Sequence, residues 1–142
     1  MRAKSGRADF RREQELAEPV ARYLRNRAFG LQGSEVAFFE YRIDIYGYSR
    51  RQDLTIAVEL KMTKWPRAVE QALLYQLCSD LVYIAMPRKQ VERVDVETLN
   101  AHGLGLIAVE RGRCEEVVPA TRSHVVRKHY RETYLAMLQE GS

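Results

Sequence analysis

Hydrophobic and polar positions alternate with two different periods along the 142-residue chain. The first patterned stretch has apolar residues at four-residue spacing, which predicts a helix over residues 12–28: Leu16, Val20 and Leu24. Proline is tolerated only in the first turn of a helix, so Pro19 indicates that the regular helix begins at residues 16–18.

Further along, strand-like and helix-like segments follow one another. β-branched and aromatic residues predict three strands, over residues 34–41, 42–48 and 54–61. Pro66 suits the first position of a helix and predicts one over residues 66–79. The rest of the pattern predicts these elements: a buried strand over 81–85, a helix over 88–102 capped by Gly103, short strands over 104–109 and 115–118, and an amphipathic helix over 121–138.

This order of elements predicts an α/β fold. A short buried strand after a crossover helix implies a mixed sheet with helices on both faces. The chain length suits one domain, which we expect over residues 13–142. Residues 1–12 are polar and basic, and we expect them to form a flexible arm.

Composition narrows the class of protein only a little. The net charge of +4 suits a polyanionic partner, although a solvated surface explains it equally well. Cys78 and Cys114 are too few and too far apart for a disulfide framework or a zinc site. The three histidines also lack the spacing of metal ligands. No segment resembles a signal peptide or a membrane span, and a reducing cytoplasm is the expected location.

The predicted strands carry the candidate chemistry. In the run Ile56–Lys61, alternation directs Glu59 and Lys61 to one face and leaves the other face apolar. Asp44 stands alone between Ile43 and Ile45, and if these two isoleucines pack into the core, Asp44 faces the opposite side. If the two strands pair, Asp44 and Glu59 converge.

Two neighbouring carboxylates repel each other unless a positive charge lies between them. A divalent cation that prefers oxygen ligands, Mg²⁺ or Mn²⁺, is therefore the candidate cofactor. Such an ion polarises a phosphodiester and lowers the pKa of a bound water molecule. Lys61 could orient that water molecule or stabilise negative charge in the transition state.

The helix after this strand adds Gln71 and Tyr75, which are four residues apart and share one helical face. A polar rim beside a core helix would explain both residues. The functional alternative is that they lie over the carboxylates and contact the substrate backbone.

Together these residues resemble the PD-(D/E)XK, or restriction-endonuclease-like, nuclease superfamily. The resemblance covers residues 13–87. It includes Asp44 in RIDIYG, Glu59 and Lys61 in AVELK, and Gln71-x-x-x-Tyr75, which is similar to the QxxxY motif of the RecB-like branch. The order of elements is also similar to the αβββαβ core of that superfamily, here followed by C-terminal strands and a terminal helix. Ile43 stands where the superfamily usually has proline.

The resemblance implies roles for these residues. Asp44, Glu59 and the backbone carbonyl of Leu60 become metal ligands, and Lys61 becomes the catalytic lysine. A carboxylate of the first helix supports the metal or its water molecule. Glu13 is the first choice, because it continues the apolar stripe of that helix, and two neighbours remain open as alternatives: Glu15 and Glu18. The glutamine and tyrosine of the QxxxY motif help to catalyse the reaction and to position substrate: Gln71 and Tyr75.

Four basic residues near the motif could bind phosphates, although solvated turns would explain them too: Lys64, Arg67, Arg50 and Arg51. We therefore predict a metal-dependent nuclease, a hydrolase that acts on DNA. The alternative is a non-catalytic nucleic-acid-binding or assembly module that retains the nuclease fold. A homodimer is consistent with the first hypothesis, because cleavage of a duplex by a small enzyme often needs two sites. The terminal helix, with its tyrosines and valines, is the candidate dimer interface.

Overall fold

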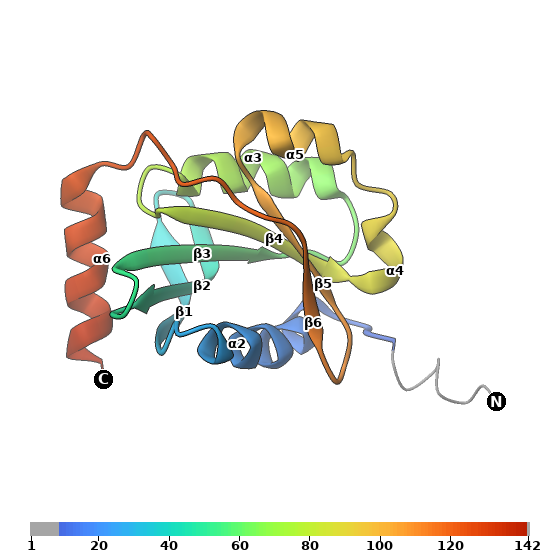
Figure 1. The fold of residues 1–142 in the computed structure, drawn as a ribbon, viewed down its shortest axis with the longest axis horizontal. Coiled ribbons are helices and arrows are strands. Elements are labelled where there is room, and N and C mark those ends of the chain that lie inside the picture. Colours follow the sequence, from blue (N-terminus) through green and yellow to red (C-terminus); the bar gives the residue numbers. More distant parts are fainter. Residues whose placement is uncertain (1–8, 142) are drawn as a thin grey trace.

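The computed structural model describes residues 9–141, which form three layers, with a sheet between two layers of helices (Figure 1). A six-stranded sheet lies in the middle. Helices α3 (Trp65–Tyr75) and α5 (Val96–His102) cover one face, α2 (Ala17–Asn26) covers the other, and α6 (Lys128–Glu140) lies beside the first two strands. The predicted α/β class, with a mixed sheet flanked by helices, is confirmed.

The sheet has the order β1-β2-β3-β4-β5-β6, so neighbours in sequence are also neighbours in space. The β3–β4 and β4–β5 pairs are parallel, and the other pairs are antiparallel. Both parallel connections cross over in the same direction, which brings α3 and α5 to the same face of the sheet. The strands have these bounds: β1 Leu31–Phe38, β2 Tyr41–Ser49, β3 Leu54–Leu60, β4 Leu81–Pro87, β5 Gly105–Val109 and β6 Cys114–Val118.

The first helix begins at a position that places Pro19 in its first turn. A short 3-10 helix, η1 (Glu13–Leu16), leads into α2, and Pro19 lies in the first turn of α2, where its missing N–H needs no partner. The predicted start of the regular helix is therefore confirmed. Other boundaries differ: the expected helix over 88–102 is two helices, α4 (Arg88–Val91) and α5, and β1 begins at Leu31 rather than at residue 34.

Strand β3 separates two hydrophobic cores. Ile56, Val58 and Leu60 pack with the residues of α2, whereas Ala57 packs with the residues of α3. The predicted alternation along this strand is thus confirmed, and its α2 face is apolar.

The β1–β2 hairpin changes faces halfway along its length. Ile45 packs in the core under α2, whereas Ile43 and its pairing partner Val36 pack in the core under α3. Residues two apart in a strand normally share a face, but these two isoleucines are buried in different cores, so their packing alone does not orient Asp44. The change occurs at Asp44 and at Glu35, which stands opposite it in the register and has a left-handed backbone, with φ of 51°.

Helix α6 begins at Lys128, because residues 121–127 are extended rather than helical as expected. Its tyrosines point into the structure: Tyr130 and Tyr134 contact the Phe38 ring edge-to-face, and the Tyr134 hydroxyl donates to the Ala37 carbonyl oxygen at 2.6 Å. The two tyrosines are therefore partly buried against the core, and a dimer interface on this helix stays a prediction.

The expected basic arm lies mostly outside the described residues. Of its last four residues, Phe10 is 9% exposed and packs in the core under α2, and Asp9 forms a 3.0 Å ion pair with Lys89. Within residues 9–141, no helix combines the length and the apolar character needed to cross a membrane.

Candidate functional site

Strands β2 and β3 separate at the two carboxylates that the sequence singled out. Their last paired residues are Ile45 and Val58, so Asp44 and Glu59 occupy the next register position, where the ladder has ended. The Asp44 carboxylate replaces the missing ladder bond and accepts a hydrogen bond from the Leu60 N–H at 2.7 Å. The two acidic residues are thus brought together at one point, as predicted.

Glu59 is almost completely buried, with 5% of its surface exposed. Its side chain points toward α3, where the Tyr75 hydroxyl donates to its Oε1 atom at 3.0 Å. The same hydroxyl lies 3.2 Å from the Arg42 carbonyl oxygen, and the Tyr75 side chain is fully buried. Tyr75 was expected to contact substrate, but this burial leaves it the different role of holding Glu59 in position.

Burial, together with nearby negative charges, disfavours the charged forms of both carboxyl groups. Burial raises the pKa of Glu59 to about 8, and repulsion from Asp44 adds to the effect, while the Tyr75 hydrogen bond and the Lys61 charge oppose it. Burial likewise raises the pKa of Asp44 to about 6, against the hydrogen bond from Leu60. A raised pKa in two adjacent groups is typical of functional sites.

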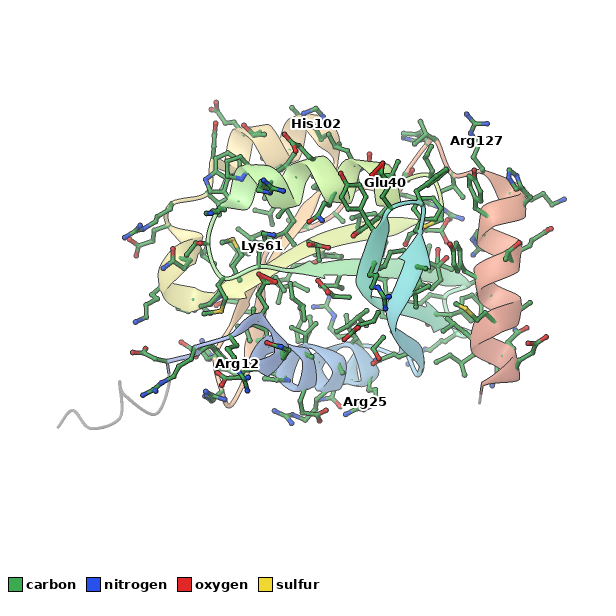
Figure 2. The ribbon with its side chains drawn as sticks, turned by 180° about the vertical axis from the view of Figure 1, so that it is seen from behind. Arg12, Arg25, Glu40, Lys61, His102 and Arg127 are labelled. Carbon is green, nitrogen blue, oxygen red and sulfur yellow. The ribbon has the colours of Figure 1, made fainter. Side chains whose placement is uncertain are left out.

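Lys61 follows the last residue of β3, and its backbone N–H donates to the Ala85 carbonyl oxygen of β4 at 3.0 Å. This bond fixes the backbone from which the side chain projects. The Lys61 ammonium lowers the pKa of both Asp44 and Glu59, so its charge acts on the two carboxylates together. Figure 2 shows Lys61 at the end of β3, between the layer of α3 and the layer of α2.

An open cleft of about 670 Å³ leads to this point from the side of α2. Asp44 and Leu60 line it, and Glu13 faces them from η1. Glu59 does not line the cleft, because it lies behind Asp44 and Leu60 at the gap between β2 and β3. A ligand entering the cleft would therefore meet Asp44 and the Leu60 backbone first.

The geometry separates the three candidate carboxylates of the first helix. Glu15 forms an ion pair with Arg111, and Glu18 forms ion pairs with two arginines of α2. Glu13, by contrast, lines the cleft, and its charge raises the pKa of both Asp44 and Glu59. Of the three, Glu13 has the position that the sequence analysis assigned to it.

Gln71 lies one helical turn before Tyr75 on the same face of α3. Its Oε1 atom is buried and has no hydrogen-bond partner among the described residues. Buried polar atoms in native proteins nearly always have a partner, so an unpaired amide oxygen one turn from the Glu59–Tyr75 bond indicates an interaction with another molecule.

The expected phosphate-binding residues separate into two groups. Lys64 and Arg67 are exposed just after Lys61, at the end of β3 that carries the site. Arg50 and Arg51 lie in the turn at the other end of β2, six or more residues from Asp44, which corresponds to about 20 Å along a strand. The structure does not bring this second pair to the carboxylates.

Three more charged residues line the cleft, and the sequence had left Glu35 open as one that could face it from the first strand. Glu35 reaches it through the left-handed backbone of β1, and its charge raises the pKa of Asp44. Arg11 and Arg12 line it from the segment before η1. The cluster of arginines near the N-terminus was the available signal for the last two, whereas strand alternation alone could not decide which way Glu35 points.

Among the described residues, no group of three or more His, Cys, Asp and Glu side chains is arranged to hold a metal ion. Any cation bound here would therefore need donors of other kinds besides Asp44 and Glu59. Backbone carbonyl groups and water molecules are the usual additional donors for Mg²⁺.

The fold and the site together define an α/β domain with a carboxylate–lysine cluster at the end of its third strand. No protein-family model matches the sequence, and no curated protein matches it. Among solved structures, a protein of unknown function from Silicibacter pomeroyi is similar, with a TM-score of 0.72 and 21% identity. The alignment covers 94% of this chain and 87% of that one, and at this identity it shows a shared fold and nothing about activity.

Proposed function

We propose that this protein is a metal-dependent nuclease that hydrolyses DNA phosphodiester bonds, built on a restriction-endonuclease-like core. The observation that carries the proposal is the meeting of Asp44 and Glu59 at the point where β2 and β3 separate, with Lys61 acting on both. The order η1/α2, β1, β2, β3, α3, β4 is consistent with the αβββαβ core that the sequence resembles.

The donor atoms at this point suit Mg²⁺ or Mn²⁺. These ions commonly use one or two carboxylates and keep several water molecules, so a full set of side-chain ligands is not required. Two carboxyl groups whose pKa values are raised by burial and by neighbouring carboxylates would both be stabilised by a divalent cation. In an extended strand the N–H and C=O of one residue point to the same side, so the Leu60 carbonyl should face Asp44 as its N–H does.

When bound, the cation would polarise the phosphodiester and lower the pKa of an attacking water molecule. The protein residues would do the rest. Asp44, Glu59 and the Leu60 carbonyl would hold the cation, and Tyr75 would fix the orientation of Glu59. Glu13, across the cleft, would accept a hydrogen bond from a water molecule of the cation. Lys61 would stabilise the negative charge that develops on the phosphate.

The test is cleavage of supercoiled plasmid, linear duplex and single-stranded DNA in EDTA, Mg²⁺ or Mn²⁺. Lys61→Ala and Asp44→Ala are the site variants. Lys128→Ala and Glu132→Ala are matched controls, because these two residues form an exposed pair on α6. We expect metal-dependent cutting that falls by about 100-fold or more in the site variants and is unchanged in the controls.

Cutting by Lys61→Ala at the wild-type rate would contradict the role assigned to this lysine. The protein would instead be a non-catalytic binding module if it binds DNA but cuts none of the substrates, and if Asp44→Ala and Lys61→Ala bind DNA as tightly as the wild type does. Calorimetric titration with Mn²⁺ shows whether the protein binds metal. This separates a module without a metal site from an enzyme that needs another substrate.

A further inference from the structure

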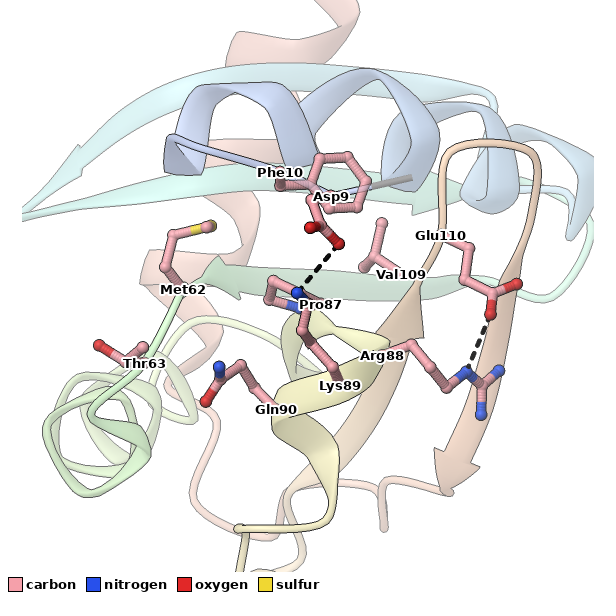
Figure 3. A pocket seen from close by; sticks show the side chains of 10 residues that line it. All are labelled: Asp9, Phe10, Met62, Thr63, Pro87, Arg88, Lys89, Gln90, Val109 and Glu110. Carbon is pink, nitrogen blue, oxygen red and sulfur yellow. Dashed lines mark ion pairs between the residues drawn. The ribbon is translucent and has the colours of Figure 1, made fainter. Parts of the chain in front are cut away.

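A second pocket, of about 300 Å³, opens beside the carboxylate cleft (Figure 3). We call it the side pocket. It is lined by the segment before η1, the loop after β3, the start of α4 and the end of β5. Its apolar surface comes from four residues: Phe10, Met62, Pro87 and Val109. The nuclease proposal above assigns no role to this pocket.

Polar groups at the side pocket could recognise a ligand with hydrogen-bonding edges. Thr63 and Gln90 line it from two different elements, and Figure 3 shows both side chains on the same side of the opening. Asp9 and Lys89 form an ion pair there at 3.0 Å, in which both side chains are well exposed. An exposed pair of this kind contributes little energy, so a ligand could displace it.

The side pocket and the carboxylate cleft adjoin at Met62, which lines both of them. Met62 is two residues from Leu60, so it lies at most about 7 Å farther along the backbone. A DNA strand with one phosphate at Asp44 and Leu60 would therefore bring a neighbouring nucleoside to the side pocket.

The charge on the cleft agrees with a strand lying along it. Arg11 and Arg12 are exposed and line the cleft, and within residues 9–141 neither guanidinium group has a hydrogen-bond or ion-pair partner. Unpaired guanidinium groups in this position are suited to phosphate oxygens. They would hold the strand between the carboxylates and the side pocket.

We propose that the side pocket binds one unpaired nucleobase next to the phosphate that is cut, and that the enzyme therefore acts on single-stranded or frayed DNA. The proposal rests on the proposed nuclease function. The volume of about 300 Å³ admits one base and part of its sugar. An apolar wall with a few polar groups is also what a base with two π-faces and a hydrogen-bonding edge requires. A base inside a duplex must leave its stack before it can enter, which favours unpaired substrates.

The first test fills the side pocket and measures binding instead of cleavage. Gln90→Trp places a large ring in the pocket, and Glu92→Trp is the matched control, because Glu92 is exposed just beyond α4 and does not line the pocket. Fluorescence anisotropy in EDTA gives the affinity for a single-stranded oligonucleotide and for a blunt duplex. Thermal unfolding shows whether each variant is folded.

We expect wild-type protein to prefer the single strand. Gln90→Trp should bind the single strand about tenfold more weakly, because the stacking of one base in the pocket is lost. Its affinity for the duplex should change little. Glu92→Trp should bind both as the wild type does.

The second test needs no substitution. A 2-aminopurine base, placed at successive positions of a single-stranded oligonucleotide, fluoresces more strongly when it leaves the base stack. Abasic sites at the same positions remove the base. The proposal predicts one position at which the fluorescence rises on binding wild-type protein and at which an abasic site weakens binding.

Equal weakening of single-strand and duplex binding by Gln90→Trp, or no 2-aminopurine response at any position, would overturn the proposal even if the protein cuts DNA with metal. The expected binding pattern in a protein that cuts nothing would support the side pocket and count against the nuclease. The absence of any DNA binding would overturn the side-pocket proposal.

Discussion

Asp44 and Glu59 are held where the folded protein disfavours their charged forms. Among residues 9–141, each has a single hydrogen-bond donor, the Leu60 N–H for Asp44 and the Tyr75 hydroxyl for Glu59, and these donors only partly offset burial. Ionised carboxylates with so few donors are stable only beside a positive charge. At the scale of single residues, the cation of the proposed function would offset this cost.

Stability without metal should fall as pH rises. A carboxyl group whose pKa is higher in the folded protein binds its proton more tightly there, so the free energy of unfolding falls between the unfolded and folded pKa values. For Glu59 this window runs from a pKa of 4.5 to about 8, and for Asp44 from a pKa of 3.8 to about 6. Each pKa unit corresponds to about 1.4 kcal/mol, so the loss should be about 5 kcal/mol for Glu59 and about 3 kcal/mol for Asp44.

Urea unfolding in EDTA at several pH values measures this effect, with Glu59→Gln beside the wild type. The variant cannot ionise, so its stability relative to the wild type should increase with pH across the window of Glu59. A constant difference between the two proteins would contradict the raised pKa. Addition of Mg²⁺ should stabilise the wild type most at the high end of the range, where protons no longer compete.

Tyr75→Phe should weaken metal binding near neutral pH. The hydroxyl holds the pKa of Glu59 down, so its removal should raise that pKa further and make the cation compete with a more tightly bound proton. We expect about tenfold weaker Mn²⁺ binding by calorimetry, with the pH profile moved to higher pH. Tyr134→Phe is the control, because it loses a comparable hydrogen bond, to Ala37, at a distance from the carboxylates. An unchanged pH profile in Tyr75→Phe would leave Tyr75 with a structural role only.

At the scale of elements, the β1–β2 hairpin shapes the cleft by changing faces. The left-handed backbone at Glu35 directs this residue into the cleft opposite Asp44, and the hairpin beyond it packs under α3. A residue with a Cβ atom in this conformation costs about 1–2 kcal/mol. Backbone strain of this kind often occurs at functional sites.

The strain at Glu35 can be separated from its charge by two substitutions. Glu35→Ala removes the carboxylate and keeps the Cβ atom, whereas Glu35→Gly removes both. Glu35→Gly should therefore be more stable than Glu35→Ala by about 1 kcal/mol in urea unfolding. Both should lower the pKa of Asp44, because the Glu35 charge raises it. If Glu35→Gly is the less stable variant, the backbone at this position is not strained.

At the scale of the whole molecule, a buried ionic network joins α6 to the sheet. Asp80 is 3% exposed and accepts hydrogen bonds from the Thr55 N–H and hydroxyl and from Arg131 Nε at 3.0 Å. Arg131 also reaches Asp53 in the turn before β3. The network lies at the start of β3, and the carboxylate site lies at its end.

Arg131→Met should reduce the free energy of unfolding by about 3 kcal/mol, because it leaves the buried Asp80 without its nearest cation. Lys128→Met is the matched control on the same helix, and its exposed pair with Glu132 should be worth less than about 0.5 kcal/mol. Urea unfolding measures both. Under native conditions, the folded Arg131→Met variant should bind metal as tightly as the wild type. A weaker affinity would show that the two ends of β3 are coupled.

Local patterns predicted much of this molecule because they follow from the geometry of the chain. The alternation of β3 gave the correct face for Glu59, and Pro19 gave the correct start for α2. Gly103 caps α5 with φ of 74°, as expected of a glycine at that position. The same reasoning failed at Ile43, because the left-handed backbone of another strand reversed its face.

The sequence by itself determined the α/β order of elements, the two carboxylates and the lysine beside them, because helical and strand periodicities are properties of short segments. Only the tertiary structure decided which groups meet. It buried Tyr75 against Glu59, brought Glu35 opposite Asp44, and joined residues from four distant segments in the side pocket. These contacts depend on pairings between segments far apart in the chain, which form when the sheet and its two cores assemble together and which no local pattern records.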